Sequence, residues 1–64
     1  MVKINGSLRD AAGSTLEEFL EAEGYDKKRV AAELNGSIVP KALYGETLLH
    51  EGDSLEIVSF VGGG

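Results

Sequence analysis

The chain has 64 residues, 11 acidic and six basic side chains, a net charge of −5 and no cysteine. This length indicates one small domain without room for an ordinary catalytic cleft, because such a chain buries only about 60% of its unfolded surface. The lack of cysteine excludes disulfides, thiol nucleophiles and cysteine-ligated metals, and the negative charge disfavours nucleic acid as a partner.

The chain opens with a predicted β-hairpin. Residues 2–4 alternate apolar and polar side chains, and Asn5-Gly6 is the strongest short hairpin signal, so residues 7–12 should return as a second strand. The opening residues have no signal-peptide pattern, and no apolar run approaches the roughly 20 residues of a membrane span. We therefore expect a cytoplasmic protein.

A short helix is predicted at residues 15–23. Ser14 and Glu17 fit a capping box in which Ser14 is the N-cap, and Gly24 stands where a left-handed C′ residue belongs. The apolar residues recur at i, i+3 and i+4, as Leu16, Phe19 and Leu20. A helix of this length is not stable alone in water, so its apolar stripe must lie on a sheet.

Two further strands and an irregular segment follow the helix. Residues 29–35 alternate as a half-buried strand, Asn35-Gly36 repeats the hairpin turn, and residues 37–39 form a short strand that Pro40 ends at a sheet edge. Residues 41–49 are the least regular part. Its expected packing residues are Leu43, Tyr44, Leu48 and Leu49. This order of elements favours an α+β fold with two layers.

The last strand should lie in the middle of the sheet, because its run stays apolar to its end. Leu55 and Ile57 share one parity and should face the helix, which leaves Val58 and Phe60 on the opposite, open face. Apolar side chains exposed together there would be candidates for docking a partner. The alternative is that the irregular segment, residues 41–49, covers them.

Three glycines, Gly62, Gly63 and Gly64, end the sequence. Glycines do not favour continuing a strand, so we divide the chain into a domain at 1–61 and a flexible tail at 62–64. Three extended residues span about 10 Å, enough to carry the Gly64 carboxylate into a partner's cleft. The alternative is a frayed terminus without function.

No other part of the sequence predicts catalysis or a metal site. His50 is the only histidine and has no second histidine or cysteine to complete a metal site or a triad, so we interpret it as an ordinary surface residue. Asp26 and Asp53 are isolated and lack the spacing of a calcium loop. Glu17, Glu18 and Glu21 are interpreted as a solvated helix face. We therefore predict no metal and no enzyme activity.

Three segments together resemble a known family. They are residues 32–40 (AELNGSIVP), residues 52–58 (GDSLEIV) and residues 60–64 (FVGGG). These segments, with the length and the lack of cysteine, resemble the sulfur-carrier proteins of thiamine biosynthesis, the ThiS family. The resemblance implies a ubiquitin-like β-grasp fold, with a mixed sheet of four to five strands and one main helix across one face.

The resemblance also implies a function. Members of this family are not enzymes; an ATP-dependent enzyme of the ubiquitin-activating type adenylates their terminal glycine, a sulfur donor converts the adenylate to a thiocarboxylate, and thiazole synthase takes the sulfur. By this likeness Gly64 would carry the sulfur, Gly62 and Gly63 would give reach, and Val58, Phe60 and Val61 would dock. Adenylate and thiocarboxylate would be transient, no cofactor would be bound stably, and the free protein would be a monomer.

Two other functions fit the same residues. The small subunit of molybdopterin synthase is similar in fold and in its activated diglycine, although those chains run longer and usually lack the Ile-Val-Pro element present here at residues 38–40. A β-grasp binding module, or a modifier conjugated to lysines, is the third possibility. Deleting Gly64 would abolish the function of a carrier or a modifier and leave that of a binding module.

Overall fold

A computed structural model describes residues 1–60 of the chain, and the expectations for Val61 and for the tail at 62–64 lie outside these residues. The elements in chain order are β1 (Val2–Ile4), β2 (Ser7–Arg9), α1 (Leu16–Ala22), the 3₁₀ helix η1 (Lys27–Arg29), β3 (Val30–Leu34), β4 (Ser37–Ile38), the 3₁₀ helix η2 (Lys41–Glu46) and β5 (Ser54–Ser59). None of the described helices is long and apolar enough to cross a membrane.

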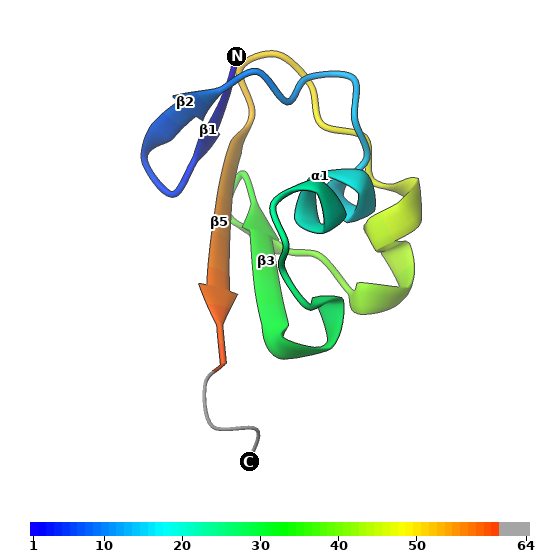
Figure 1. Ribbon diagram of the computed structural model, residues 1–64. Helices are drawn as coiled ribbons and strands as arrows, with labels where there is room; N and C mark the ends of the chain where they lie inside the picture. The colour runs from blue at the N-terminus through cyan, green and yellow to red at the C-terminus, as the bar shows by residue number, and fades with distance from the viewer. Residues whose placement is uncertain (61–64) are drawn as a thin grey trace.

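The five strands form one mixed sheet in the order β2-β1-β5-β3-β4. The last strand, β5, lies at its centre, parallel to β1 and antiparallel to β3. Figure 1 shows α1 and η2 on one side of this sheet, which leaves the other face open. The prediction of an α+β fold with one main helix across a central last strand is therefore confirmed.

Both Asn-Gly hairpins form as predicted. Asn5 and Gly6 have φ angles of 49° and 87°, and Asn35 and Gly36 have 51° and 87°. Positive φ at both central residues defines the type I′ turn, whose twist matches that of paired strands. The strand after the first turn is shorter than expected, ending at Arg9 rather than residue 12, because Arg9 already pairs with Val2 at the start of β1.

The helix α1 is capped one residue later than the sequence pattern suggested. Thr15, not Ser14, is the N-cap: its hydroxyl accepts from the Glu18 amide at 3.1 Å, and the Glu18 carboxylate accepts from the Thr15 amide at 2.8 Å. Ser14 and Glu17 have the same spacing as Thr15 and Glu18, so the sequence pattern alone does not distinguish the two possible capping boxes. The backbone conformation decides in favour of Thr15. At the other end the predicted Schellman motif is present, since the Tyr25 amide donates to the Leu20 carbonyl at 2.9 Å.

The core lies between α1 and the sheet. Its buried side chains are Val2, Ile4, Ala11, Leu16, Phe19, Leu20, Val30, Ala32, Tyr44, Leu49, Leu55 and Ile57. Tyr44 and Leu49 were expected to pack there, but the same expectation for Leu43 and Leu48 is wrong, since both are exposed. Leu48 and Leu49 are consecutive in an extended segment that pairs with Thr15, and such residues point in opposite directions.

Candidate functional site

The candidate site is the carboxyl-terminal half of β5 together with the open face of the sheet around it. Every residue of β5 between Leu55 and Ser59 is paired with β3, in a register that sets Val58 opposite Ala31. At the far end the Phe60 amide donates to the Arg29 carbonyl at 2.7 Å. The strand that leads toward the terminal glycines is thus held in place up to Phe60.

Val58 and Phe60 are exposed, by 57% and 58% respectively, and Val58 lies on the open face of the sheet. The alternative, that residues 41–49 cover them, is wrong because η2 packs against α1 on the opposite side of the sheet. Leu55 and Ile57 are buried toward the helix, as their parity predicted. The two described docking candidates therefore lie at the end of β5 and directly after it, whereas Val61 lies outside the described residues.

The side chain of Asn5 forms hydrogen bonds with the middle of β5 along the edge that faces β1, opposite the edge that pairs with β3. Its side-chain oxygen accepts from the Ile57 amide at 2.7 Å, and its side-chain nitrogen donates to the Ile57 carbonyl at 3.3 Å. β1 pairs with β5 only through Lys3 and Ile4. The side-chain amide of Asn5 therefore continues the hydrogen bonding between these two segments as far as Ile57. One residue thus forms the hairpin turn and positions the strand that carries the docking side chains.

Asn35 has a similar role at the start of β5. Its side-chain oxygen accepts from the Ser54 amide at 2.9 Å, and its side-chain nitrogen donates to the Asp53 carboxylate, also at 2.9 Å. This hydrogen bond, with a second from the His50 amide, lowers the pKa of Asp53 below its ordinary value. Sequence reasoning treated both asparagines as turn residues only; the signal for a further role was that Asn, rather than Asp or Gly, stands at both turns.

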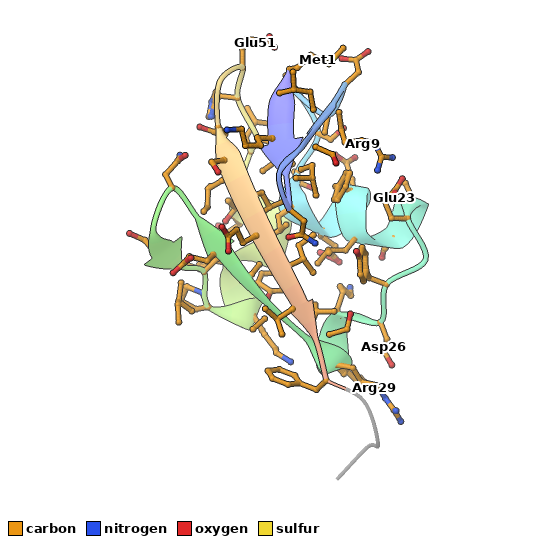
Figure 2. The ribbon with its side chains drawn as sticks, turned by 90° about the vertical axis from the view of Figure 1, so that its left-hand side faces the viewer. Met1, Arg9, Glu23, Asp26, Arg29 and Glu51 are labelled. Carbon is orange, nitrogen blue, oxygen red and sulfur yellow. The ribbon has the colours of Figure 1, made fainter. Side chains whose placement is uncertain are left out.

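Ion pairs connect α1 to β2 and to η1. Figure 2 shows Arg9 of β2 and Glu23 at the end of α1 pointing toward one another, and their charged atoms are 2.7 Å apart. This contact lowers the pKa of Glu23 and raises that of Arg9. The Lys27 ammonium nitrogen lies 2.6 Å from a carboxylate oxygen of Glu17 and 3.6 Å from one of Glu21. The pKa of Lys27 is raised, mainly by its hydrogen bond to Glu17. The predicted solvated glutamate face is therefore partly neutralised.

The remaining chemistry-bearing side chains form no site within residues 1–60. His50 is largely exposed, as expected of a surface residue, with its ring 3.8 Å from Asp53. No group of three or more histidine, aspartate or glutamate side chains in the described part of the chain could hold a metal ion. The end of β5 and the face beside it are thus the best candidate for function.

Comparison with known proteins identifies the family of the chain. The sequence model of the ThiS family matches residues 2–64, which includes the terminal glycines. The chain belongs to the ThiS family. Its five-stranded mixed sheet with one main helix is the ubiquitin-like β-grasp fold of that family.

Similar proteins carry related names. The chain is 38% identical to the sulfur carrier protein ThiS of Thermus thermophilus, over all of both chains. It is 47% identical to a thiazole synthase of Paramagnetospirillum magneticum, where the match covers 95% of this chain but 19% of that longer protein. The crystal structure of a thiamine biosynthesis protein (ThiS) from Geobacter metallireducens is also similar, with a TM-score of 0.78, 28% identity, and coverage of 98% and 97% of the two chains.

Proposed function

We propose that this ThiS-family protein is a sulfur carrier for thiazole formation in thiamine biosynthesis, and that its chemistry takes place on the carboxylate of Gly64. The observation that carries the proposal is the family match, because it runs through the terminal glycines. The relative named as a sulfur carrier is matched along its whole length. The relatives named as thiazole synthases favour thiamine over other sulfur-transfer pathways.

The composition agrees with sulfur carried on the chain end. The chain has no cysteine, so no side-chain thiol can accept or hold sulfur. A carboxylate is a poor electrophile because oxide is a poor leaving group. The Gly64 carboxylate would therefore attack the α-phosphorus of ATP, releasing pyrophosphate and forming an acyl-adenylate. Attack of hydrosulfide on the acyl carbon would then expel AMP, release the sulfur-bound proton and leave a thiocarboxylate. A protein persulfide attacking there would instead give an acyl disulfide, from which a thiol would release the thiocarboxylate by cleaving the S–S bond.

The described residues would bind and position, and would not catalyse. Val58 and Phe60 offer exposed apolar area beside the end of β5, and Val61 would extend it toward Gly62 and Gly63. The partners would be the ATP-dependent adenylating enzyme, a sulfur donor protein and thiazole synthase, all met by a monomeric carrier in the cytoplasm. The adenylate and the thiocarboxylate would be transient modifications of the chain end.

The experiment that tests this proposal is intact-mass measurement after incubation with ATP, the adenylating enzyme and a sulfur source. The full chain and a chain lacking Gly64 are compared. We expect a mass increase equal to sulfur replacing one oxygen in the full chain only. If neither an adenylate nor a thiocarboxylate forms on the full chain, the proposal is wrong.

The choice between thiazole synthase and another sulfur acceptor needs one more step. The thiocarboxylate form is mixed with purified thiazole synthase and its substrates, and the loss of sulfur from the carrier is followed by mass. Transfer to thiazole synthase supports the thiamine pathway. Transfer only to a molybdopterin-synthase large subunit would instead support the alternative carrier, and transfer to lysines of an acceptor protein would support a modifier.

A further inference from the structure

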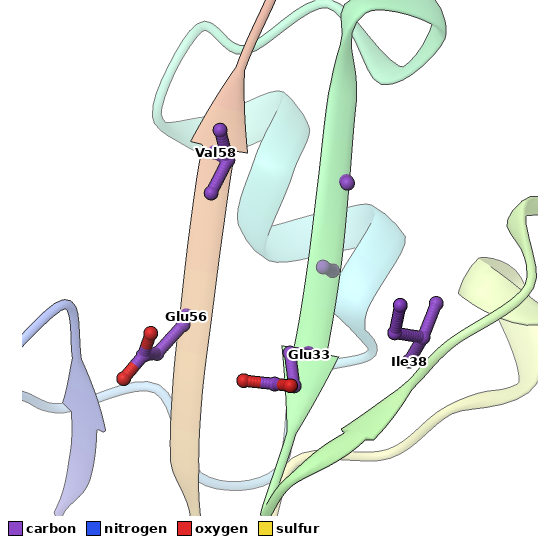
Figure 3. A pocket seen from close by; sticks show the side chains of 6 residues that line it. Glu33, Ile38, Glu56 and Val58 are labelled. Atoms are coloured by element: carbon purple, nitrogen blue, oxygen red, sulfur yellow. The ribbon is translucent and has the colours of Figure 1, made fainter.

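The open face of the sheet contains a hollow of about 180 Å³. Its lining residues are Ala31, Ala32, Glu33, Ile38, Glu56 and Val58, and Figure 3 shows the four largest of these side chains on the face turned away from α1. The hollow exists because β4 ends at Ile38, leaving the small side chain of Ala31 without a cross-strand neighbour on that side. Its walls are mainly apolar.

Two carboxylates border this hollow, and the fold places them unfavourably. Glu33 of β3 and Glu56 of β5 are direct partners in the antiparallel register, on the same face. Like charges directly opposite one another on a sheet are destabilising. Within residues 1–60 neither glutamate has an ion pair or a side-chain hydrogen bond, although Lys3 lies on the same face in β1. The described residues therefore supply no partner for the two charges.

The charges restrict what can cover this face. A second copy of the chain is disfavoured, because a symmetric contact through this face would bring four carboxylates together. A partner that placed only apolar groups here would bury two unpaired charges, which is costly. An arginine removes both costs, since its planar guanidinium can donate to two carboxylates while its methylene groups lie on apolar neighbours such as Ile38 and Val58.

We propose that the open face around Glu33 and Glu56 docks a protein partner through an arginine that bridges these two carboxylates, with an apolar side chain of the same partner filling the hollow at Ala31. The proposal deepens the proposed function and rests on it, because the partner is taken to be the adenylating enzyme that receives the end of β5. It also gives the acidic pair a role in selecting partners, since like charge on a wrong partner would be repelled.

The test measures the affinity of the purified adenylating enzyme, without ATP, for three chains. They are the wild type, the double variant Glu33→Gln with Glu56→Gln, and a matched control, Asp10→Asn with Glu46→Gln. The control removes the same charge from exposed carboxylates outside the hollow. We expect about a tenfold rise in Kd for the Glu33/Glu56 variant and less than about a twofold change for the control.

Salt and stability provide two further readouts. The wild type should lose affinity between 50 and 200 mM salt, because added salt shortens the Debye length and screens the attraction between the carboxylates and the arginine. The Glu33/Glu56 variant should lose less affinity over the same range. The urea midpoint of that variant should equal or exceed the wild-type value, because a like-charge contact has been removed. A lowered midpoint would overturn the proposal, since the pair would then support the fold. Equal effects of both double variants, or no binding by the wild type, would also overturn it.

A parallel mass measurement separates this proposal from the proposed function. Deleting Gly64 should abolish sulfur uptake but leave the difference between the Glu33/Glu56 variant and the control. If the full chain takes up no sulfur but the binding difference remains, the carrier function fails and the docking proposal stands. If sulfur uptake is normal and the Glu33/Glu56 variant binds like the wild type, the docking proposal alone fails.

Discussion

The side chain of Asn5 connects two strands that are more than 50 residues apart in the sequence. It forms both hydrogen bonds to the backbone of Ile57, while its own backbone adopts the positive φ of a type I′ turn. At the other end of β5, the side chain of Asn35 accepts from the Ser54 amide and donates to the Asp53 carboxylate. At the scale of single residues, the strand that carries Val58 and leads to Phe60 is therefore aligned by two amide side chains.

Replacing Asn5 with Gly should destabilise the protein by about 1–3 kcal/mol, because the Ile57 amide loses its acceptor while the turn keeps a residue that tolerates positive φ. Asn5→Asp is the matched control: it keeps an acceptor for the Ile57 amide but loses the donor, so its cost should be smaller. Equilibrium urea unfolding measures both. Equal stability of the wild type and Asn5→Gly would contradict this role.

Acid should destabilise the protein partly through Asp53. The pKa of Asp53 is lowered in the folded state, so this carboxylate binds a proton more readily when the protein is unfolded. Its contribution to the free energy of unfolding is therefore present above the unfolded pKa of about 3.9 and is lost as the pH falls through the lower folded pKa. Glu23 acts in the same direction. Thermal midpoints between pH 6 and pH 2 should therefore fall less for Asp53→Asn than for the wild type. Parallel curves for the two proteins would refute this.

At the scale of elements, α1 depends on its ends and on its contact with the sheet. It has only seven residues, fewer than an isolated helix needs in water. A capping box, a Schellman motif and the buried side chains of Leu16, Phe19 and Leu20 all favour the helical form. Ion pairs from Lys27 and Arg9 connect its exposed side to neighbouring segments.

Thr15→Ala should cost about 1 kcal/mol, because the Glu18 amide at the first turn of α1 loses its acceptor. Ser14→Ala, at the position that the sequence pattern suggested, should change the free energy of unfolding by less than about 0.5 kcal/mol. The two values come from chemical unfolding under identical conditions. A larger loss for Ser14→Ala than for Thr15→Ala would mean that the cap lies at Ser14 in solution.

At the scale of the whole molecule, the two faces of the sheet have different roles. The face toward α1 and η2 contributes the core, and the open face carries exposed apolar side chains and the Glu33–Glu56 pair. β5 belongs to both, since Leu55 and Ile57 point inward while Val58 points outward. A central strand ending in a docking surface allows partner binding to change without a change in the core.

Phe60→Ala should raise the Kd for the adenylating enzyme by about tenfold or more, since exposed aromatic side chains are frequent hot spots of interfaces. The free energy of unfolding should change by less than about 1 kcal/mol, because more than half of Phe60 is already exposed. Leu43→Ala is the control: Leu43 is 45% exposed and belongs to η2, on the side of the sheet away from the open face. Equal losses of affinity for both variants would exclude a specific role for Phe60.

Local sequence patterns were enough to predict the elements whose signals lie in neighbouring residues. Two Asn-Gly turns require positive φ, Gly24 permits the left-handed end of α1, and the alternation in residues 54–59 assigns each side chain to a face. The order of these elements was enough for the two-layer fold, and the segments shared with the ThiS family were enough for the family. These features depend on neighbours in the chain, so the residues themselves carry the information.

Features that depend on distant partners could not be predicted from local patterns and became visible in the three-dimensional fold. The cap at Thr15 rather than Ser14, the inward choice of Leu49 over Leu48, and the early end of β2 each follow from a neighbouring segment. So do the hydrogen bonds of Asn5 to Ile57 and the register that sets Glu33 opposite Glu56. Backbone pairing between distant strands fixes such contacts, and local sequence patterns do not encode which residues will meet.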